Sequence, residues 1–299
     1  MTIQEALRKY SKIEIDLLLS HVLGTSKEFL YLRPETKLSS KHLKILAKLV
    51  KHRLRGEPMA YILGYKDFYG LRIKVSRDVL IPRPETEELV EMTLEYLKNS
   101  KLKAKSLKLL DLGAGSGCVI ISLAKTLLTR MTLALRKGHP CDWKFCASDI
   151  SSKALAIARQ NAKTILNKYF NTSKYGGIRG NSKPIKFVRS DLFDKIKGKF
   201  DVVIANLPYV TKKDYESRIK NLGWEPKIAL TDGTGRWELY EKFFKQIPRH
   251  LEPKAEIFLE IDPKSLQKIR AWTKKYLPAA KIVFTKNLAG RFRFARIST

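Results

Sequence analysis

Hydrophobic positions along the chain change their spacing close to residue 66. Before that point apolar side chains recur at helical intervals, as Ile13 and Leu17 do, which predicts several short amphipathic helices. The segment 68–75 then alternates between apolar and polar residues, which is typical of a β-hairpin. We therefore expect a small helical domain over residues 1–66 and a β-hairpin linker over residues 67–84.

Strand and helix patterns alternate from residue 107 to the end of the chain. Short apolar runs that suit buried strands are followed by longer stretches with helical spacing. This order is typical of an α/β domain with a mostly parallel sheet, which we place over residues 85–299. Two basic segments, 129–142 and 170–183, are predicted to be inserted surface loops. The expected strands are 107–112, 144–148, 185–188, 201–205, 256–261, 281–285 and 291–297, and the expected helices are 119–128, 153–169, 237–251 and 265–276.

Positive charge dominates the composition. The chain has 59 Lys and Arg residues against 29 Asp and Glu residues, a formal net charge of +30. Such an excess favours an acidic partner such as RNA, a ribonucleoprotein or an acidic protein. A general enrichment in lysine on solvated surfaces would give the same count, so the composition leaves both interpretations open.

Cysteines are few, and the chain shows no pattern for export or membrane insertion. Cys118, Cys141 and Cys146 form neither a disulfide framework nor a repeated metal-binding spacing, so we expect a reducing compartment and no metal site. The residues after Met1 lack the apolar core of a secretory signal. No stretch reaches the roughly 20 apolar residues that cross a bilayer. A cytoplasmic protein is the expectation.

A glycine-rich turn follows the first strand of the α/β domain. The sequence from Asp111 to Gly117 reads Asp-Leu-Gly-Ala-Gly-Ser-Gly, and glycines there let a ligand approach the backbone closely. The turn could hold a dinucleotide or be purely structural. Its Gly-x-Gly-x-Gly spacing resembles the first motif of the Rossmann-like methyltransferases, which implies S-adenosylmethionine as the cofactor. The candidate cofactor contacts in it are Gly113, Ala114, Gly115, Ser116 and Gly117.

Two acidic residues follow the next strands in an order that suits a bound nucleoside. Asp149 ends the second strand, where its carboxylate could accept hydrogen bonds from both ribose hydroxyls. Capping of the following helix is its alternative role. Asp191 and Leu192 follow the third strand, where the carboxylate could accept from the adenine amino group and the leucine could pack on the ring. An aspartate in an ordinary loop is the alternative at that position.

The segment Asn206-Leu-Pro-Tyr209 follows the fourth strand and suits methyl transfer to a planar NH2 group. The nitrogen lone pair of an amide is delocalised into the carbonyl, so a site must hold that nitrogen on the methyl axis and orient the lone pair. The Asn206 side-chain oxygen and the Leu207 carbonyl could accept its two N–H bonds. Pro208 would fix the backbone, and Tyr209 could stack on the planar group. An ordinary Asn-x-Pro turn is the alternative.

These segments resemble the HemK/PrmC-type protein-(glutamine-N5) methyltransferases, which methylate the glutamine of the Gly-Gly-Gln motif in peptide chain release factors. The resemblance covers most of the chain and rests on several uncommon segments that occur in the same order. They are Glu57–Gly64, Phe68–Leu71, Val79–Glu87, Asp111–Gly117, Asp201–Tyr209 and Trp224–Leu230.

The resemblance implies a Rossmann-like class I methyltransferase domain with a seven-stranded, mostly parallel sheet, preceded by a helical domain that recognises the substrate. It also implies S-adenosylmethionine as cofactor and a peptide chain release factor as partner. By the same resemblance Asp149, Leu192 and Asn206 contact the cofactor beside the glycine turn, and residues 206–209 hold the glutamine. Residues 83–85 would lie near the cofactor pocket.

Two positions depart from the family pattern and leave other functions open. The family usually has proline where this chain has Leu207, and more often has Glu-Ile-Gly where it has Glu260-Ile-Asp262. Asn-Leu-Pro-Tyr also resembles the rRNA adenine N6-methyltransferases, so an adenine N6-methyltransferase on RNA or DNA is the alternative enzyme. Its substrate would present the same planar NH2 group after base extrusion, and basic side chains would help to bind it. An RNA- or ribosome-binding module without activity is the third hypothesis, against which the intact glycine turn and Asn206 argue.

Overall fold

The computed structural model describes residues 1–99, 106–136, 142–170, 185–217, 223–231, 233 and 237–299. Within these ranges the chain forms two compact units, residues 1–66 and residues 67–299. No helix in the described ranges is long and apolar enough to span a membrane.

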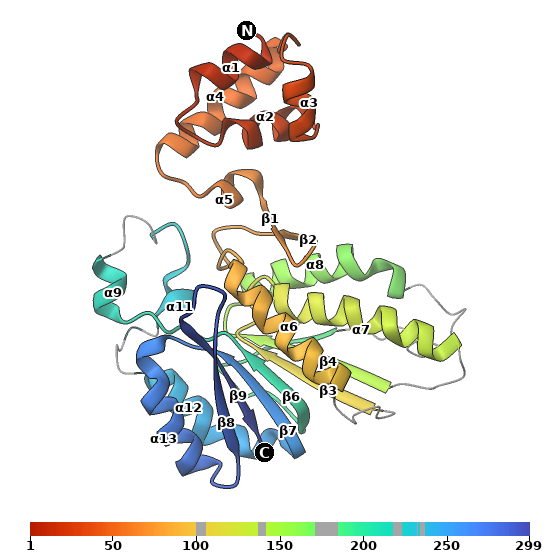
Figure 1. The fold of residues 1–299 in the computed structure, drawn as a ribbon, viewed down its shortest axis with the longest axis vertical. Coiled ribbons are helices and arrows are strands. Elements are labelled where there is room, and N and C mark those ends of the chain that lie inside the picture. The colour runs from red at the N-terminus through yellow and green to blue at the C-terminus, as the bar shows by residue number, and fades with distance from the viewer. Residues whose placement is uncertain (100–105, 137–141, 171–184, 218–222, 232, 234–236) are drawn as a thin grey trace. The chain divides into compact units, whose positions relative to one another are not determined.

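The first unit is a cluster of helices around a small apolar core (Figure 1). Its helices are α1 Ile3–Lys9, α2 Ile15–Leu23, α3 Lys27–Leu32, α4 Ser40–Leu54 and α5 Met59–Leu63. Leu18 and Leu19 of α2 and Leu30 of α3 are fully buried in this core, which is what helical spacing of apolar residues produces. The side chains of Ser26 and Ser39 accept hydrogen bonds from backbone N–H groups in the first turns of α3 and α4, so both helices begin with a capping residue.

A two-stranded sheet follows these helices along the chain. It consists of β1 Tyr65–Phe68 and β2 Leu71–Lys74. Tyr69 and Gly70 turn the chain between the two strands, and both have positive φ angles. Residues 75–83 form no further strand and lead directly into the first long helix of the second unit.

A seven-stranded sheet forms the centre of the second unit. Its strands are β3 Ser106–Leu112, β4 Asp142–Asp149, β5 Ile185–Arg189, β6 Phe200–Ala205, β7 Leu251–Glu260, β8 Lys281–Lys286 and β9 Phe292–Ser298. Their order in the sheet is β5-β4-β3-β6-β7-β9-β8. The first five of these run parallel to one another, and β9 is antiparallel to both β7 and β8. The order and directions confirm the predicted seven-stranded, mostly parallel sheet.

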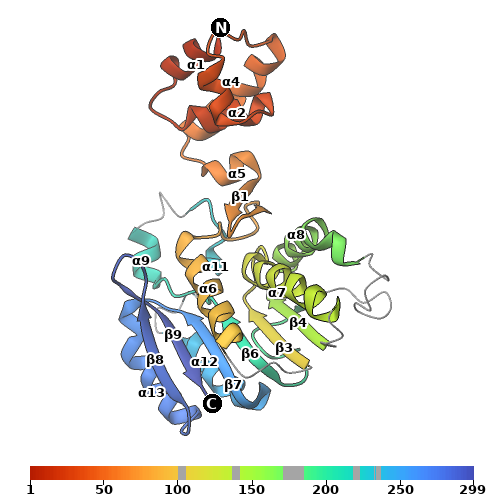
Figure 2. The same cartoon turned by 45° about the vertical axis from the view of Figure 1, so that its right-hand side comes forward.

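Helices cover both faces of this sheet (Figures 1 and 2). Their bounds are α6 Pro84–Asn99, α7 Cys118–Arg136, α8 Ser152–Phe170, α9 Lys212–Ser217, α11 Lys227–Leu230, α12 Glu238–Gln246 and α13 Leu266–Tyr276, with short 3-10 helices at Ile247–His250 and Pro263–Ser265. α6, α7 and α8 lie side by side on one face, and α12 and α13 cover the other. Alternate strand residues such as Leu110, Val203 and Leu259 form a core with Phe243 of α12.

One predicted loop and one predicted helix had wrong boundaries, and β7 begins at Leu251, five residues before the strand expected at 256–261. The expected basic loop at 129–142 is helical as far as Arg136, because its leucines and alanines favour continuation of α7. The predicted helix 237–251 leaves α-helical geometry after Gln246, because Pro248 has no backbone N–H to donate. The remainder of the first predicted loop, residues 137–141, and almost all of the second, from 171 onward, lie outside the described residues.

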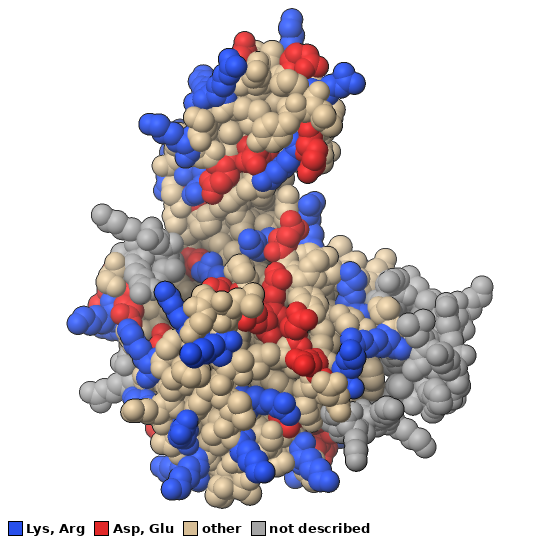
Figure 3. Space-filling model, in the orientation of Figure 1, with Lys and Arg blue, Asp and Glu red and all other residues tan. Residues whose placement is uncertain are grey.

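Charged side chains are unevenly distributed over the visible face of the second unit (Figure 3). Acidic side chains gather along α6, whose sequence contains five glutamates in its first twelve residues. Basic side chains are spread over the rest of this face and form no single patch there. The positive charge of the chain therefore does not mark one docking surface in this view.

Candidate active site

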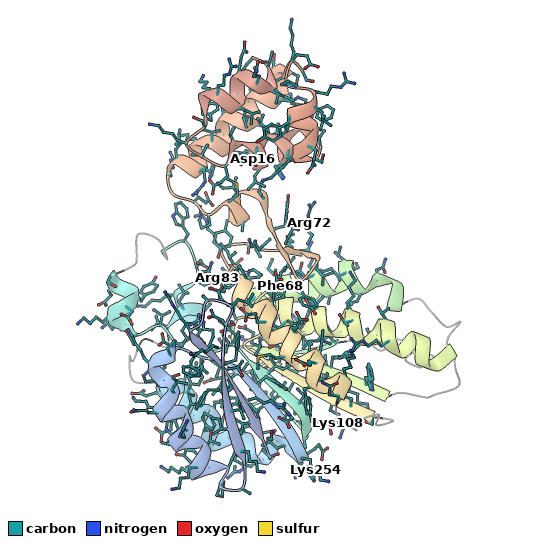
Figure 4. All side chains as sticks on the ribbon, in the orientation of Figure 1. Asp16, Phe68, Arg72, Arg83, Lys108 and Lys254 are labelled. Carbon is teal, nitrogen blue, oxygen red and sulfur yellow. The ribbon has the colours of Figure 1, made fainter. Side chains whose placement is uncertain are left out.

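The predicted motif segments meet at the carboxyl-terminal edge of the parallel strands, where sheets of this kind bind ligands. They surround a cavity of about 280 Å³. In Figure 4, Arg83 stands at this end of the sheet, whereas Lys108 and Lys254 mark the opposite end. The predicted site residues that line the cavity are Gly113, Gly115, Asp149, Asp191, Leu192, Asn206, Leu207 and Pro208, and those that do not are Ala114, Ser116, Gly117 and Tyr209.

Positive φ angles and close packing explain the glycines of the turn. The φ angle is +74° at Gly113 and +53° at Gly115, a region that residues with side chains rarely adopt. The backbone nitrogen of Gly113 donates to the Ser148 carbonyl at 2.9 Å, which ties the turn to β4. Gly117 also has a positive φ angle, +79°, and a Cβ atom there would in addition come within 2.8 Å of the Ile121 side chain and 3.1 Å of Ala158 on α8. The first two glycines therefore open the cavity, and the third permits helix packing.

Asp149 holds the glycine turn with its side chain. Its Oδ2 accepts from the backbone nitrogen of Gly115 at 2.9 Å, and its Oδ1 accepts from that of Ser151 at 2.8 Å. Burial raises the pKa of the Asp149 carboxyl, because a desolvated carboxylate is less stable. Each oxygen has a further lone pair, so two ribose hydroxyls could still donate to it. Ser151 caps the following helix, as its Oγ accepts from the Ala154 nitrogen at 3.1 Å.

Asp191 forms an ion pair with a lysine that is distant in the sequence, so the residues around Asp191 did not predict this contact. Nζ of Lys242 on α12 lies 2.6 Å from Oδ2 of Asp191, and this hydrogen bond raises the pKa of the lysine. Asp191 thus presents the cavity with a partly neutralised carboxylate. Leu192 beside it is buried at the cavity wall with a φ angle of +47°, which is uncommon for a residue with a side chain.

Asn206 is held by side chains from two other elements. Its Nδ2 donates to Oε2 of Glu260 at 2.8 Å and to Oγ1 of Thr86 at 3.3 Å. No residue in the described part of the chain donates to its Oδ1, which is therefore available as an acceptor. The Leu207 carbonyl, the second predicted acceptor, receives a hydrogen bond from the Tyr240 hydroxyl at 3.3 Å and keeps a second lone pair.

Tyr209 is engaged by the same network. The guanidinium carbon of Arg293 lies 4.7 Å from the centroid of the Tyr209 ring. The tyrosine hydroxyl donates to Oε1 of Glu260 at 3.3 Å and accepts from Nη2 of Arg293. Burial raises the pKa of Tyr209, which keeps the phenol neutral. Arg293 covers one face of the Tyr209 ring. Stacking of Tyr209 on a planar substrate group therefore stays a prediction, and it could involve only the other face of the ring.

A partly buried ion pair fixes the segment 78–81, part of which lines the cavity. Glu225 is almost fully buried, accepts from the backbone nitrogen of Ile81 at 3.0 Å and pairs with the Arg83 guanidinium. The contact brings together two of the uncommon sequence segments, 79–87 and 224–230, and places Arg83 close to the cavity wall.

The sequence did not assign the residues that orient Asn206 and Tyr209. They are Thr86 on α6, Glu260 at the end of β7 and Arg293 on β9. The sequence contains one indication that Glu260 is functional, because it is a charged residue at the end of an otherwise apolar strand pattern. Thr86 lies within the uncommon segment Val79–Glu87, but no local pattern relates it, or Arg293, to Asn206.

Comparison with known proteins places the chain in a family. Residues 2–64 match the model of the PrmC N-terminal domain. The release factor glutamine methyltransferase of Lactococcus lactis subsp. lactis is 36% identical over 79% of this chain and 75% of its own length. That of Buchnera aphidicola subsp. Acyrthosiphon pisum is 33% identical over 92% and 89%. The chain belongs to the release factor glutamine methyltransferases.

Two further matches concern the fold of this methyltransferase. Residues 118–286 match the model of the Eco57I restriction-modification methylase. The catalytic domain of hMettl16, solved in complex with a 3′UTR hairpin, has a TM-score of 0.54 at 14% identity and covers 94% of this chain and 91% of its own. At that identity the likeness shows a shared fold alone. The family and class I fold expected from the sequence are thus confirmed.

Proposed function

We propose that this methyltransferase transfers a methyl group from S-adenosylmethionine to the side-chain amide nitrogen of a glutamine in the Gly-Gly-Gln motif of a peptide chain release factor. The main support for this proposal is the Asn206 amide at the cavity. Its nitrogen donates to Thr86 and Glu260, and its oxygen remains available as an acceptor. The names of the relatives supply the substrate class.

The residues around the cavity fit S-adenosylmethionine. Gly113 and Gly115 present backbone without side chains, Asp149 has free lone pairs for ribose hydroxyls, and Val79 and Leu192 offer apolar surface for an adenine ring. The bound cofactor supplies an electrophilic methyl group on a sulfonium.

The chain's own residues orient the nucleophile. Asn206 Oδ1 and the Leu207 carbonyl accept the two N–H bonds of the substrate amide, which directs the nitrogen lone pair along the methyl axis. No general base is needed at the start, because the nitrogen loses its proton after it has become cationic. Pro208 restricts the backbone that carries both acceptors.

We assign recognition of the release factor to residues 1–66, with residues 67–84 as linker and 85–299 as the catalytic domain. The helical unit offers exposed apolar side chains for this role, since Tyr31 and Leu32 at the end of α3 are 64% and 76% exposed. Adjacent exposed aromatic and aliphatic residues are typical of protein-binding surfaces.

An adenine N6-methyltransferase acting on RNA or DNA is the second candidate. The match of residues 118–286 to a restriction-modification methylase favours it, and so does the net charge of +30. The same pair of acceptors would hold an exocyclic adenine NH2 group after base extrusion.

One assay separates the two candidates. Labelled S-adenosylmethionine is offered in parallel with a release factor that carries Gly-Gly-Gln and with ribosomal RNA, and Asn206→Ala serves as the inactive control. Label on the glutamine that disappears with Asn206→Ala supports the proposed function, and a Gly-Gly-Ala release factor should then receive none. Label on RNA adenine, with none on the protein, would replace it by the second candidate.

A further inference from the structure

Glu260 lies at the centre of the hydrogen bonds that surround the methyl-transfer motif. Its side chain is fully buried at the end of β7, where an unpaired carboxylate would strongly destabilise the fold. Side chains from four other positions direct donors at its two oxygens. They are Thr86 Oγ1 at 2.7 Å, Asn206 Nδ2 at 2.8 Å, Tyr209 OH at 3.3 Å and Arg293 Nη2 at 3.5 Å.

This arrangement permits one orientation of the Asn206 amide. The Thr86 hydroxyl donates its own proton to Glu260, so its oxygen can only accept from Asn206 Nδ2. Both acceptors thus require the NH2 end of the amide. A flipped amide would place its oxygen against the buried carboxylate and leave its nitrogen without these partners, and leaving buried polar groups unsatisfied is strongly unfavourable.

The charge of Glu260 also acts through the amide. A hydrogen bond from Nδ2 to a carboxylate shifts electron density toward the amide oxygen, and hydrogen bonds in such chains strengthen one another in a buried setting. Asn206 Oδ1 then accepts more strongly from a substrate NH2 group, most of all when the substrate nitrogen becomes cationic. Glu260 does not line the cavity, so it is not placed to take a proton from the substrate.

We propose that Glu260 is a positioning residue for methyl transfer, which fixes and polarises the Asn206 amide so that Oδ1 orients the substrate nitrogen. This inference rests on the proposed function, since it assumes a planar NH2 substrate at Asn206. It assigns the carboxylate a task beyond stabilising the fold.

A second buried glutamate on the same strand provides the control. Glu256 pairs with Arg296 of β9 through hydrogen bonds of 2.9 and 3.2 Å, and it lies toward the end of β7 that carries Lys254 (Figure 4), away from the cavity. Glu256→Gln therefore weakens an ion pair on the same strand that makes no contact with Asn206, although its arginine is more exposed than Arg293.

Steady-state methyl transfer should separate the two glutamates. We expect Glu260→Gln to lower kcat at least 30-fold, with the dissociation constant for S-adenosylmethionine changed less than threefold. Glu256→Gln should lose some thermal stability and keep kcat within threefold of the parent. Equal effects of the two variants on kcat would overturn the proposal.

Thr86 gives a gentler variant should Glu260→Gln fail to fold. Thr86→Val removes the second acceptor of the Asn206 amide while the carboxylate remains, and we expect kcat to fall about 3- to 10-fold. Thr86→Ser restores the hydroxyl and should recover kcat. An inactive Thr86→Ser, or a fully active Thr86→Val, would contradict the positioning role.

The amide itself can be observed without any substrate. In protein labelled with ¹⁵N-asparagine, the Asn206 side-chain signals are those missing from Asn206→Ala, and their exchange with solvent should be at least tenfold slower in the parent than in Glu260→Gln. Identical exchange would overturn the positioning role whatever the substrate. Slow exchange in an enzyme that leaves glutamine unlabelled would instead overturn the proposed function alone.

Discussion

Asn161 on α8 holds the carbonyl of Ser116 in the glycine turn. Its Nδ2 donates to that oxygen at 2.9 Å and to the Lys74 carbonyl at 3.0 Å, while its Oδ1 accepts from the Lys74 backbone nitrogen at 2.8 Å. The side chain is buried, so these hydrogen bonds are shielded from water. One asparagine therefore fixes the end of β2 and the cofactor-side turn in a single network.

Asn161→Asp should destabilise the protein and weaken cofactor binding. The variant keeps the shape but loses both N–H donors, so two carbonyl oxygens would face a carboxylate. We expect the free energy of unfolding in urea to fall by about 2–4 kcal/mol, and calorimetry to show weaker S-adenosylmethionine binding. Gln160→Ala is the control, because its exposed side chain contacts only the Lys74 ammonium among these groups. If Asn161→Asp were as stable as the parent, the hydrogen bonds of Asn161 would not contribute to the stability of the fold.

Asp149→Asn should raise the dissociation constant for S-adenosylmethionine at least tenfold, or about 1.4 kcal/mol. The amide can accept only one of the two backbone hydrogen bonds that the carboxylate accepts, and its NH2 group would face the other N–H. Asp194→Asn is a suitable control, since Asp194 contacts Lys242 but does not line the cavity. Calorimetric binding by Asp149→Asn equal to that of the parent would show that the ribose lies elsewhere.

Leu207→Pro should preserve transfer to glutamine within about threefold. The Leu207 carbonyl is the part that the proposed mechanism uses, and proline keeps it. The side chain is buried, with Cδ2 3.4 Å from where a Cβ on Gly113 would lie, so lost packing should lower the free energy of unfolding by about 1–2 kcal/mol. Complete loss of kcat, with Leu207→Ala still active, would mean that the mechanism depends on the backbone conformation that leucine allows.

Asp111→Asn should make the protein without cofactor more stable at pH 8. Burial, and to a lesser extent the charge of Asp149, raises the pKa of Asp111 from 3.8 to about 7. The folded state therefore keeps a proton that the unfolded state releases above about pH 4, and stability falls as pH rises to about 7 and is then level. We expect the variant to gain about 1–4 kcal/mol at pH 8 and less than half of that at pH 5, by urea denaturation. If Asp111→Asn were less stable than the parent at pH 8, favourable interactions of the Asp111 carboxylate in the folded state would outweigh the cost of its burial.

The sequence by itself determined the features that depend on short stretches of chain. The glycine turn, the carboxyl-terminal position of Asp149 and the Asn206–Tyr209 segment were assigned correctly to strand ends, because strand and helix periodicity and glycine conformation are local properties. Order and spacing of uncommon segments were enough to identify the family. The continuation of α7 to Arg136 was missed because a basic composition suits a solvated helix as well as a loop.

Only the tertiary structure decided how the Asn206 amide is held. Thr86 and Glu260 are 120 and 54 residues away from it along the chain, and they reach it because α6 begins, and β7 ends, at the edge of the sheet where β6 ends. The roles of these side chains depend on burial. In a buried setting the Glu260 carboxylate is a strong hydrogen-bond acceptor, and only the side chains packed around it can donate to it. Such contacts join residues that are distant in sequence, and no local periodicity encodes them.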